Sequence, residues 1–102
     1  MSAVKAVVLY PHPTDKDEFE RRYAEEHVPL CQEMLPGMTQ LLVCKVLGSP
    51  AGKPAFYKLV ELHYPSMEAM QADFSGRGGA ATAKHSQEIS TGGAPTILVT
   101  TA

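Results

Sequence analysis

Residues 14–37 read TDKDEFERRYAEEHVPLCQEMLPG, and this stretch decides the fold because it predicts the first helix. Large side chains recur in it every three or four residues, which is the period of one face of an amphipathic α-helix. Acidic residues fill the predicted first turn, where they face the positive end of the helix dipole. We expect Thr14 to cap the helix. The side chains on the shared face are Phe19, Tyr23, His27, Leu30 and Met34.

Pro29 lies inside this predicted helix. A proline donates no backbone hydrogen bond and collides with the carbonyl group four residues earlier, here that of Glu25. It also disfavours helical angles in the preceding residue, so we expect a kink or a restart near Val28. Pro36 and Gly37 then end the helix.

Segments rich in apolar and β-branched residues predict four strands outside this helix. A second helix is predicted after Ser66, which is a suitable N-cap, and Met67, Met70 and Phe74 form its apolar stripe. We expect the glycines of residues 76–79 to end that helix, and a further helical turn to run from Ala80 to Glu88. The four strands are expected at residues 3–10, 38–47, 56–64 and 96–101.

The order of the elements is therefore β-α-β-β-α-β, the split βαβ or ferredoxin-like arrangement of the α+β class. It implies one domain over residues 1–102, with a four-stranded antiparallel sheet and two helices on one face. No helix remains to cover the other face, which is also apolar. We therefore expect a homodimer, in which two such sheets meet face to face as a dimeric α/β barrel.

Composition excludes several classes of protein. The chain has 102 residues and a formal net charge of −2, and a nucleic-acid partner is not expected because phosphate binding requires clustered Lys and Arg. No membrane association is expected either, since no apolar run reaches the roughly 20 residues of a membrane span. The first residues lack the pattern of a signal peptide, and Cys31 and Cys44 form no disulfide framework. These features predict a cytoplasmic location.

Tyr23 and His27 are the first candidates for chemistry, because their spacing of four places both rings on one helix face. A histidine at a helix break can titrate near neutral pH and act as a general acid or base. His27 is therefore the predicted catalytic residue, and Tyr23 and Tyr10 are predicted to contact a ligand, Tyr10 from the mouth of a cavity. The alternative is a core histidine whose nitrogens bond to the backbone.

Glu61 and His63 share one face of the third strand and are further predicted ligand-binding residues. A carboxylate beside an imidazole orients its tautomer and raises its pKa. We expect this face, with Tyr57 and Leu59, to line the cavity, because the opposite face is more apolar and suits helix packing. Lys58 on the opposite face argues against this unless it lies at the rim. The alternative is a solvated face or a dimer contact.

The remaining histidines, His12 and His85, are expected to be exposed. The four histidines lack the spacing of metal ligands, so no metal site is predicted. The glycines of residues 76–79 follow no strand and are not succeeded by Gly-Lys-Ser or Gly-Lys-Thr, so no phosphate-binding loop is predicted.

Together these residues closely resemble the EthD family, named after ethyl tert-butyl ether degradation. The most specific part is the string Phe-x-x-x-Tyr-x-x-x-His-x-Pro-Leu, which runs here from Phe19 to Leu30. The resemblance implies a dimeric α/β barrel in a cytoplasmic bacterial protein. Its wider superfamily includes cofactor-free oxygenases, cyclases, isomerases and haem-degrading enzymes. The other segments that carry the resemblance are Val4–Tyr10, Pro36–Gly37, Tyr57–Tyr64, Ser66–Ala69 and Thr91–Ala94.

Three hypotheses about function follow. In the first, the protein binds an apolar, oxygen-bearing small molecule and transforms it without a cofactor, by acid–base or oxygenase-type chemistry, in a degradation or secondary-metabolism context. His27 would move the proton, while Tyr23, Glu61 and His63 would orient the substrate. In the second, the protein is a non-catalytic binding or accessory protein of an oxygenase system. In the third, it is a haem-binding, monooxygenase-like protein with His27 or His63 as axial ligand.

Overall fold

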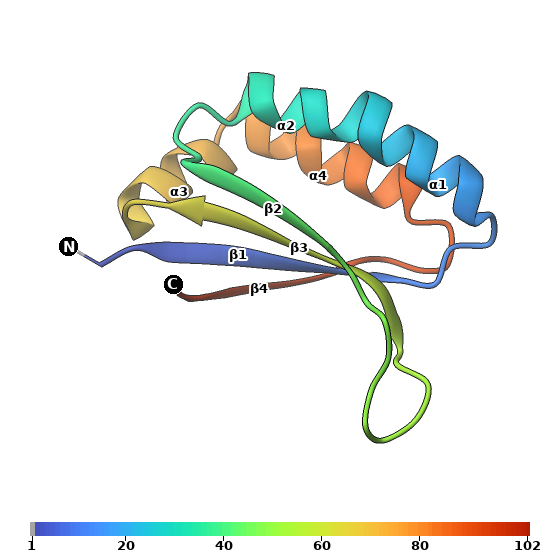
Figure 1. Ribbon diagram of the computed structural model, residues 1–102. Helices are drawn as coiled ribbons and strands as arrows, with labels where there is room; N and C mark the ends of the chain where they lie inside the picture. The colour runs from blue at the N-terminus through green and yellow to red at the C-terminus, as the bar shows by residue number, and fades with distance from the viewer. Residues whose placement is uncertain (1) are drawn as a thin grey trace.

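A four-stranded antiparallel sheet carries the helices in the computed structural model, which describes residues 2–102 (Figure 1). The strands follow the spatial order β2-β3-β1-β4, with helices after β1 and after β3. This is the predicted β-α-β-β-α-β arrangement, so the α+β class is confirmed. The strands are β1 (Val4–Pro11), β2 (Gln40–Lys45), β3 (Phe56–Tyr64) and β4 (Thr96–Thr101).

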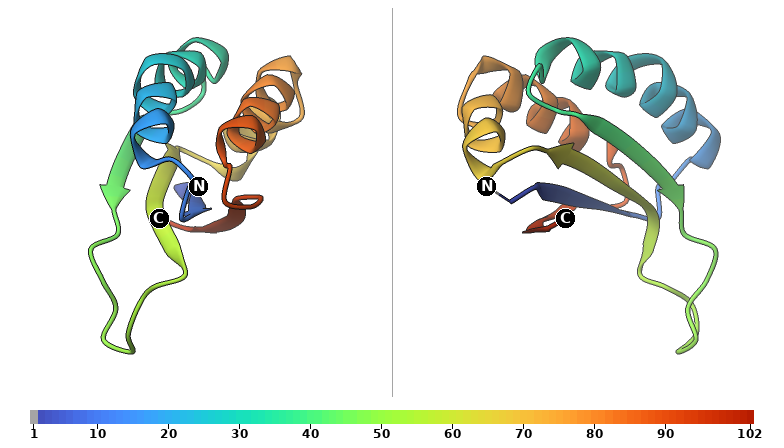
Figure 2. Two further views of the ribbon diagram at one scale, coloured as in Figure 1. Left: turned by 90° about the vertical axis from the view of Figure 1, so that its right-hand side faces the viewer. Right: turned by 60° about the vertical axis from the view of Figure 1, so that its left-hand side comes forward.

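The alternation of side chains along β1 identifies the covered face of the sheet. Val4, Ala6, Val8 and Tyr10 are buried, whereas the residues between them are partly exposed. Val8 pairs with Val60 of β3, so the even-numbered residues of both central strands face the same way. All helices pack on this face, and the other face stays uncovered within residues 2–102 (Figure 2).

The first helical region is one continuous rod with a wide turn in its middle. In that turn the Val28 N–H donates to the carbonyl of Tyr23, five residues earlier, which is the bond pattern of a π-helix. The predicted interruption is therefore a wider turn at Pro29. Val28 keeps helical angles (φ −59°, ψ −49°), contrary to our expectation. The rod consists of α1 (Lys16–Arg22), η1 (Tyr23–His27) and α2 (Val28–Met34).

Asp15 caps α1, so the expectation for Thr14 is wrong by one residue. The Asp15 Oδ1 atom accepts the Glu18 N–H at 3.1 Å. The backbone N–H of Thr14 instead donates to the hydroxyl of Thr91, at the other end of the chain. Thr and Asp are both good caps, and only the path of the chain decides which of them takes the position.

The second helical region contains α3 (Met67–Phe74) and α4 (Arg77–Ile89). Ser66 caps α3 as predicted, because its hydroxyl accepts the Ala69 N–H. As predicted, α3 ends before Gly76, but α4 begins at Arg77, earlier than predicted, and includes Gly78 and Gly79. A Cβ atom on Gly78 would lie 1.9 Å from the carbonyl oxygen of Met34, so glycine allows α4 to touch the end of α2.

The uncovered face of the sheet carries exposed apolar side chains. Leu42 pairs with Glu61 and Leu98 pairs with Val7, and these residues lie on the side away from the helices. Leu42 and Leu98 are 37% and 50% exposed. Beside this face, the loop between β2 and β3 projects away from the sheet (Figure 1). None of the helices in the described range has both the length and the apolar composition needed to cross a membrane.

Candidate functional site

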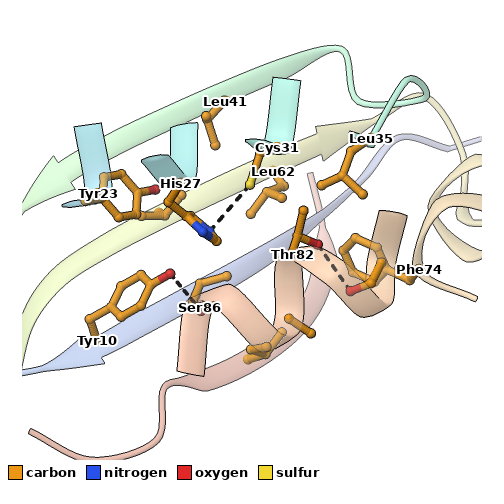
Figure 3. A pocket seen from close by; sticks show the side chains of 16 residues that line it. Tyr10, Tyr23, His27, Cys31, Leu35, Leu41, Leu62, Phe74, Thr82 and Ser86 are labelled. Atoms are coloured by element: carbon orange, nitrogen blue, oxygen red, sulfur yellow. Dashed lines mark hydrogen bonds between the residues drawn. The ribbon is translucent and has the colours of Figure 1, made fainter. Parts of the chain in front are cut away.

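A pocket of about 170 Å³ lies between the helices and the covered face of the sheet (Figure 3). Its floor is apolar, because the even-numbered residues of the central strands, such as Val8 and Leu62, point into it. Polar side chains enter from the two sides of the helix layer. Tyr23 and His27 come from η1, and Ser86 comes from α4. The pocket therefore combines an apolar interior with a few convergent polar groups, as small-molecule sites do.

His27 is the central polar residue of this pocket. Only 6% of it is exposed, and both ring nitrogens meet side chains. Nδ1 lies 2.9 Å from Nδ1 of His85, and Nε2 lies 3.4 Å from Sγ of Cys31. Burial, aided by the nearby His85, lowers the pKa of His27 to about 4. His27 is thus a neutral imidazole at pH 7, with neither nitrogen held by the backbone.

His85 connects this imidazole to a carboxylate at the surface. The Nε2 atom of His85 lies 3.0 Å from Oε1 of Glu26, which also accepts a bond from Nε of Arg22 at 3.0 Å. These two hydrogen bonds lower the pKa of Glu26, so that its carboxylate stays ionised. His85 is largely buried between η1 and α4, so the expectation that it is exposed is wrong. Its position depends on the packing of α4.

The polar hydroxyls of the pocket are held in their neutral form. Tyr10 and Ser86 share a hydrogen bond of 2.8 Å, and burial raises the pKa of Tyr10 to about 12. Burial also raises the pKa of Tyr23 well above its usual range. The ring centroid of Tyr23 lies 5.3 Å from that of His27. Tyr10, Tyr23 and His27 are therefore brought together in one pocket, with phenol groups that donate hydrogen bonds at neutral pH.

Glu61 and His63 lie on the other face of the sheet and do not meet His27. Their side chains bond each other at 2.8 Å, and Lys5 Nζ lies 3.3 Å from Glu61. The even-numbered face packs against the helices, as expected, and this pocket lies there, whereas Leu59, Glu61 and His63 lie on the uncovered face. Lys58 is on that even face and is buried, and its amine pairs with Glu20 and lies 4.5 Å from the ring centroid of Tyr23.

His12 and Tyr57 also lie differently from what the sequence led us to expect. His12 is half-buried, and its Nε2 atom lies 2.9 Å from the carbonyl oxygen of Pro54 in the projecting loop. Tyr57 contacts α1 despite its odd number, because its hydroxyl donates to Glu20 and its ring meets Phe19 edge-on. The register shift next to Pro11 explains this change of face.

Sequence reasoning missed the contribution of α4 to the pocket. Thr82 and Ser86 both line it, and Cys31 lies in contact with His27. The spacing of Thr82, Ser86 and Ile89 by four and three residues is a helical signal that identifies the inward face of α4. Within residues 2–102, no group of three or more His, Cys, Asp or Glu side chains is placed to hold a metal ion.

Comparison with known proteins places the chain in a family. A family model for the EthD domain matches residues 11–89. The chain is 32% identical over 80 residues to an uncharacterized 11.0 kDa protein from the thcB–thcC intergenic region of Rhodococcus erythropolis, covering 78% of this chain and 77% of that protein. Among solved structures, an ethyl tert-butyl ether degradation (EthD) family protein from Bacillus halodurans is 30% identical, with a TM-score of 0.87 and 98% of each chain covered.

A more distant structure supports the fold alone. A dimeric ferredoxin-like protein of unknown function from Jannaschia has a TM-score of 0.71 at 10% identity, and covers 98% of this chain and 99% of its own. The family match includes the Phe19–Leu30 string, which supplies Tyr23 and His27 to the pocket. By its sequence and by its fold, this chain belongs to the EthD family.

Proposed function

We propose that this protein binds a small, largely apolar molecule with an oxygen group in the pocket under its helices, and that His27 accepts a proton from it. The observation that carries the proposal is the neutral imidazole of His27 in the wall of an apolar pocket. An imidazole that stays neutral at pH 7 keeps a lone pair on one ring nitrogen and can act as a base. The ligand has to replace the thiol of Cys31, which lies 3.4 Å from Nε2, to reach that nitrogen. Tyr23 then supplies a neutral phenol beside it to hydrogen-bond the ligand oxygen.

The size of the pocket indicates the size of the ligand. An apolar cavity of roughly 150 Å³ is known to bind benzene. At about 170 Å³, this pocket suits a molecule of one ring or of two small fused rings. The pair of Tyr10 and Ser86 adds a second polar point, since two hydroxyls that share one hydrogen bond retain one free O–H. A ring with one or two oxygen substituents matches this set of groups.

The same pocket does not favour the haem hypothesis. A porphyrin carries four linked pyrrole rings, whereas this volume matches one or two small rings. His63, the other proposed axial ligand, lies on the opposite side of the sheet and bonds to Glu61. The non-catalytic hypothesis needs the pocket but not the base, so it differs from our proposal only in the role of His27.

We also propose that the uncovered sheet face binds a second copy of the chain. Leu42 and Leu98 are exposed there on either side of a central polar group formed by Lys5, Glu61 and His63. Apolar side chains of this kind on the open face of a small sheet are typical of an interface. Glu61 and His63 then belong to the dimer contact, which was one of the alternatives that the sequence left open.

Binding is tested with phenol, a single ring with one oxygen, titrated into labelled protein and followed by NMR. We expect shifts at residues of the pocket. Ala83→Leu places a larger side chain at the edge of the pocket and should weaken phenol binding at least about tenfold. Changes of this size in an apolar pocket typically have effects of this magnitude. Ala80→Leu is the matched control, because Ala80 is exposed on the same helix and does not line the pocket. Equal binding by both variants would contradict the assigned pocket.

Proton abstraction is tested with 5-nitrobenzisoxazole. A base removes its ring C–H proton, the N–O bond breaks, and a coloured cyanophenolate forms. We expect the protein to catalyse this reaction and His27→Gln to lose at least about a hundredfold of the rate, the usual contribution of a general base. His63→Gln is the control, since His63 lies outside the pocket. If His27→Gln binds phenol normally and wild type is no faster than this variant, the protein is a binder and the catalytic part of the proposal is wrong.

A further inference from the structure

A chain of hydrogen bonds leads from the pocket to the surface. It begins at Nε2 of His27, passes from Nδ1 of His27 to Nδ1 of His85 over 2.9 Å, and continues from Nε2 of His85 to Glu26 over 3.0 Å. The two imidazole planes differ by only 10°, and their Nδ1 edges face each other. Glu26 is 37% exposed, so the chain ends at solvent.

The donors and acceptors in this chain follow from its end at Glu26. An ionised carboxylate only accepts, so Nε2 of His85 carries the proton. A neutral imidazole has one N–H, so Nδ1 of His85 is an acceptor and Nδ1 of His27 must donate to it. The Nε2 atom of His27 then carries the lone pair that the proposed base requires. A contact between two Nδ1 atoms allows only one of them to hold a proton.

We propose that Glu26, His85 and His27 form a proton relay that carries the positive charge away from His27 when His27 acts as a base. The proton leaves the ligand and binds Nε2 of His27, while the Nδ1 proton of His27 moves to Nδ1 of His85. The ligand becomes an anion, His27 is neutral again in its other tautomer, and His85 becomes an imidazolium beside the Glu26 carboxylate. This inference rests on the proposed function, because that function supplies the proton.

The relay has a physical advantage over a lone buried base. A positive charge on His27 would be desolvated in an apolar pocket, which is why its pKa is lowered to about 4. On His85 the same charge faces a carboxylate at 3.0 Å. The other charged or titratable groups around the chain include Arg21 and Arg22 next to Glu26, Tyr10, Tyr23 and Cys31 in the pocket, and Lys58, whose amine lies over the ring of Tyr23. His85 and Glu26 are therefore positioning residues that act through His27.

The first test needs no ligand and reads the proton positions directly. In protein with ¹⁵N-labelled histidines, NMR at neutral pH should show His27 as the Nδ1–H tautomer and His85 as the Nε2–H tautomer. On acidification, His85 should take up the proton, and His27 should stay neutral and switch to the Nε2–H tautomer at the same midpoint. The relay is wrong if wild-type His27 is Nε2–H at neutral pH, or if His85 gains a proton without any change at His27.

The second test separates proton transfer from simple orientation of His27. In His85→Asn the side-chain oxygen still accepts the Nδ1 proton of His27, but it cannot take that proton over. We expect His27 to remain Nδ1–H in this variant, with the rate on 5-nitrobenzisoxazole reduced at least about tenfold. In His85→Phe no side chain accepts the Nδ1 proton of His27. We therefore expect His27 to lose its preference for the Nδ1–H tautomer, and the rate on 5-nitrobenzisoxazole to be lost. A wild-type rate in His85→Asn would overturn the relay and leave only a role in orientation.

The two proposals fail in different ways. If wild-type protein is no faster than His27→Gln, the catalytic function is wrong, and the relay is still judged by the coupled switch of the two histidines in NMR. If the rate depends on His27 but the switch is absent, the function holds and the relay is wrong. Circular dichroism of each variant, together with the unchanged resonances of His63 on the far side of the sheet, verifies that the fold is intact.

Discussion

The Nδ1 atoms of His27 and His85 lie 2.9 Å apart, although 58 residues separate the two histidines in the chain. This contact joins η1 to α4 across the helix layer and holds His27 in the wall of the pocket. The imidazole of His27 is titratable and buried, so its protonation links the stability of the fold to pH. The pocket and the acid stability of the protein therefore depend on the same residue.

The first prediction concerns this link. The pKa of His27 is about 4 in the folded protein and 6.5 when unperturbed. Between these values the unfolded chain binds more protons, so the free energy of unfolding falls as the pH falls, by about 3 kcal/mol in total. Urea unfolding of wild type and His27→Gln near neutral pH and near pH 4 measures this loss. We expect a smaller loss in the variant, and equal losses would show that His27 is not the group responsible.

The second prediction distinguishes the two candidate caps of α1. Asp15→Ala should lower the free energy of unfolding by about 1 kcal/mol, because the Glu18 N–H loses its acceptor. Thr14→Ala should change it by less than about 0.5 kcal/mol, since the contact of Thr14 with Thr91 uses the backbone N–H. Urea unfolding of both variants provides the comparison. A larger effect at Thr14 would return the cap to the residue that the sequence suggested.

The third prediction concerns the close contact between α4 and α2. Gly78→Ala places a Cβ atom 1.9 Å from the Met34 carbonyl oxygen, so one of the two helices must move. We expect a loss of about 3 kcal/mol in the free energy of unfolding. Gly48→Ala is the control, because nothing lies within 4 Å of its added atom, and it should change stability by less than about 0.5 kcal/mol. Similar unfolding curves for both variants would show that α4 does not approach α2 so closely.

The fourth prediction addresses the proposed dimer. Leu98→Asp puts a charge on the uncovered sheet face, where a second copy would have to bury it, so the variant should be a monomer. Met67→Asp changes an exposed residue on the helix layer and should leave the wild-type assembly intact. Light scattering after size-exclusion chromatography measures both masses. A wild-type monomer, or a dimer that survives Leu98→Asp, would contradict the assigned interface.

The sequence alone determined the elements of the fold and their order. Local signals sufficed for β3, whose bounds match the prediction, and for the Ser66 cap of α3, because strand alternation and capping act over a few residues. The same periodicity placed Tyr23 and His27 together on the inward face of a helix. It also limited the strand-three side chains to two opposite faces, without fixing which face would meet His27.

Only the tertiary structure decided what surrounds His27. Whether Gly78 breaks a helix or allows a close helix contact depends on Met34, a residue from another element. Once α4 packs in that way, His85 reaches His27, and the pocket forms under the helices and not on the face of Glu61 and His63. Sequence patterns report local geometry, whereas a bond between residues 58 positions apart depends on how two helices cross one sheet.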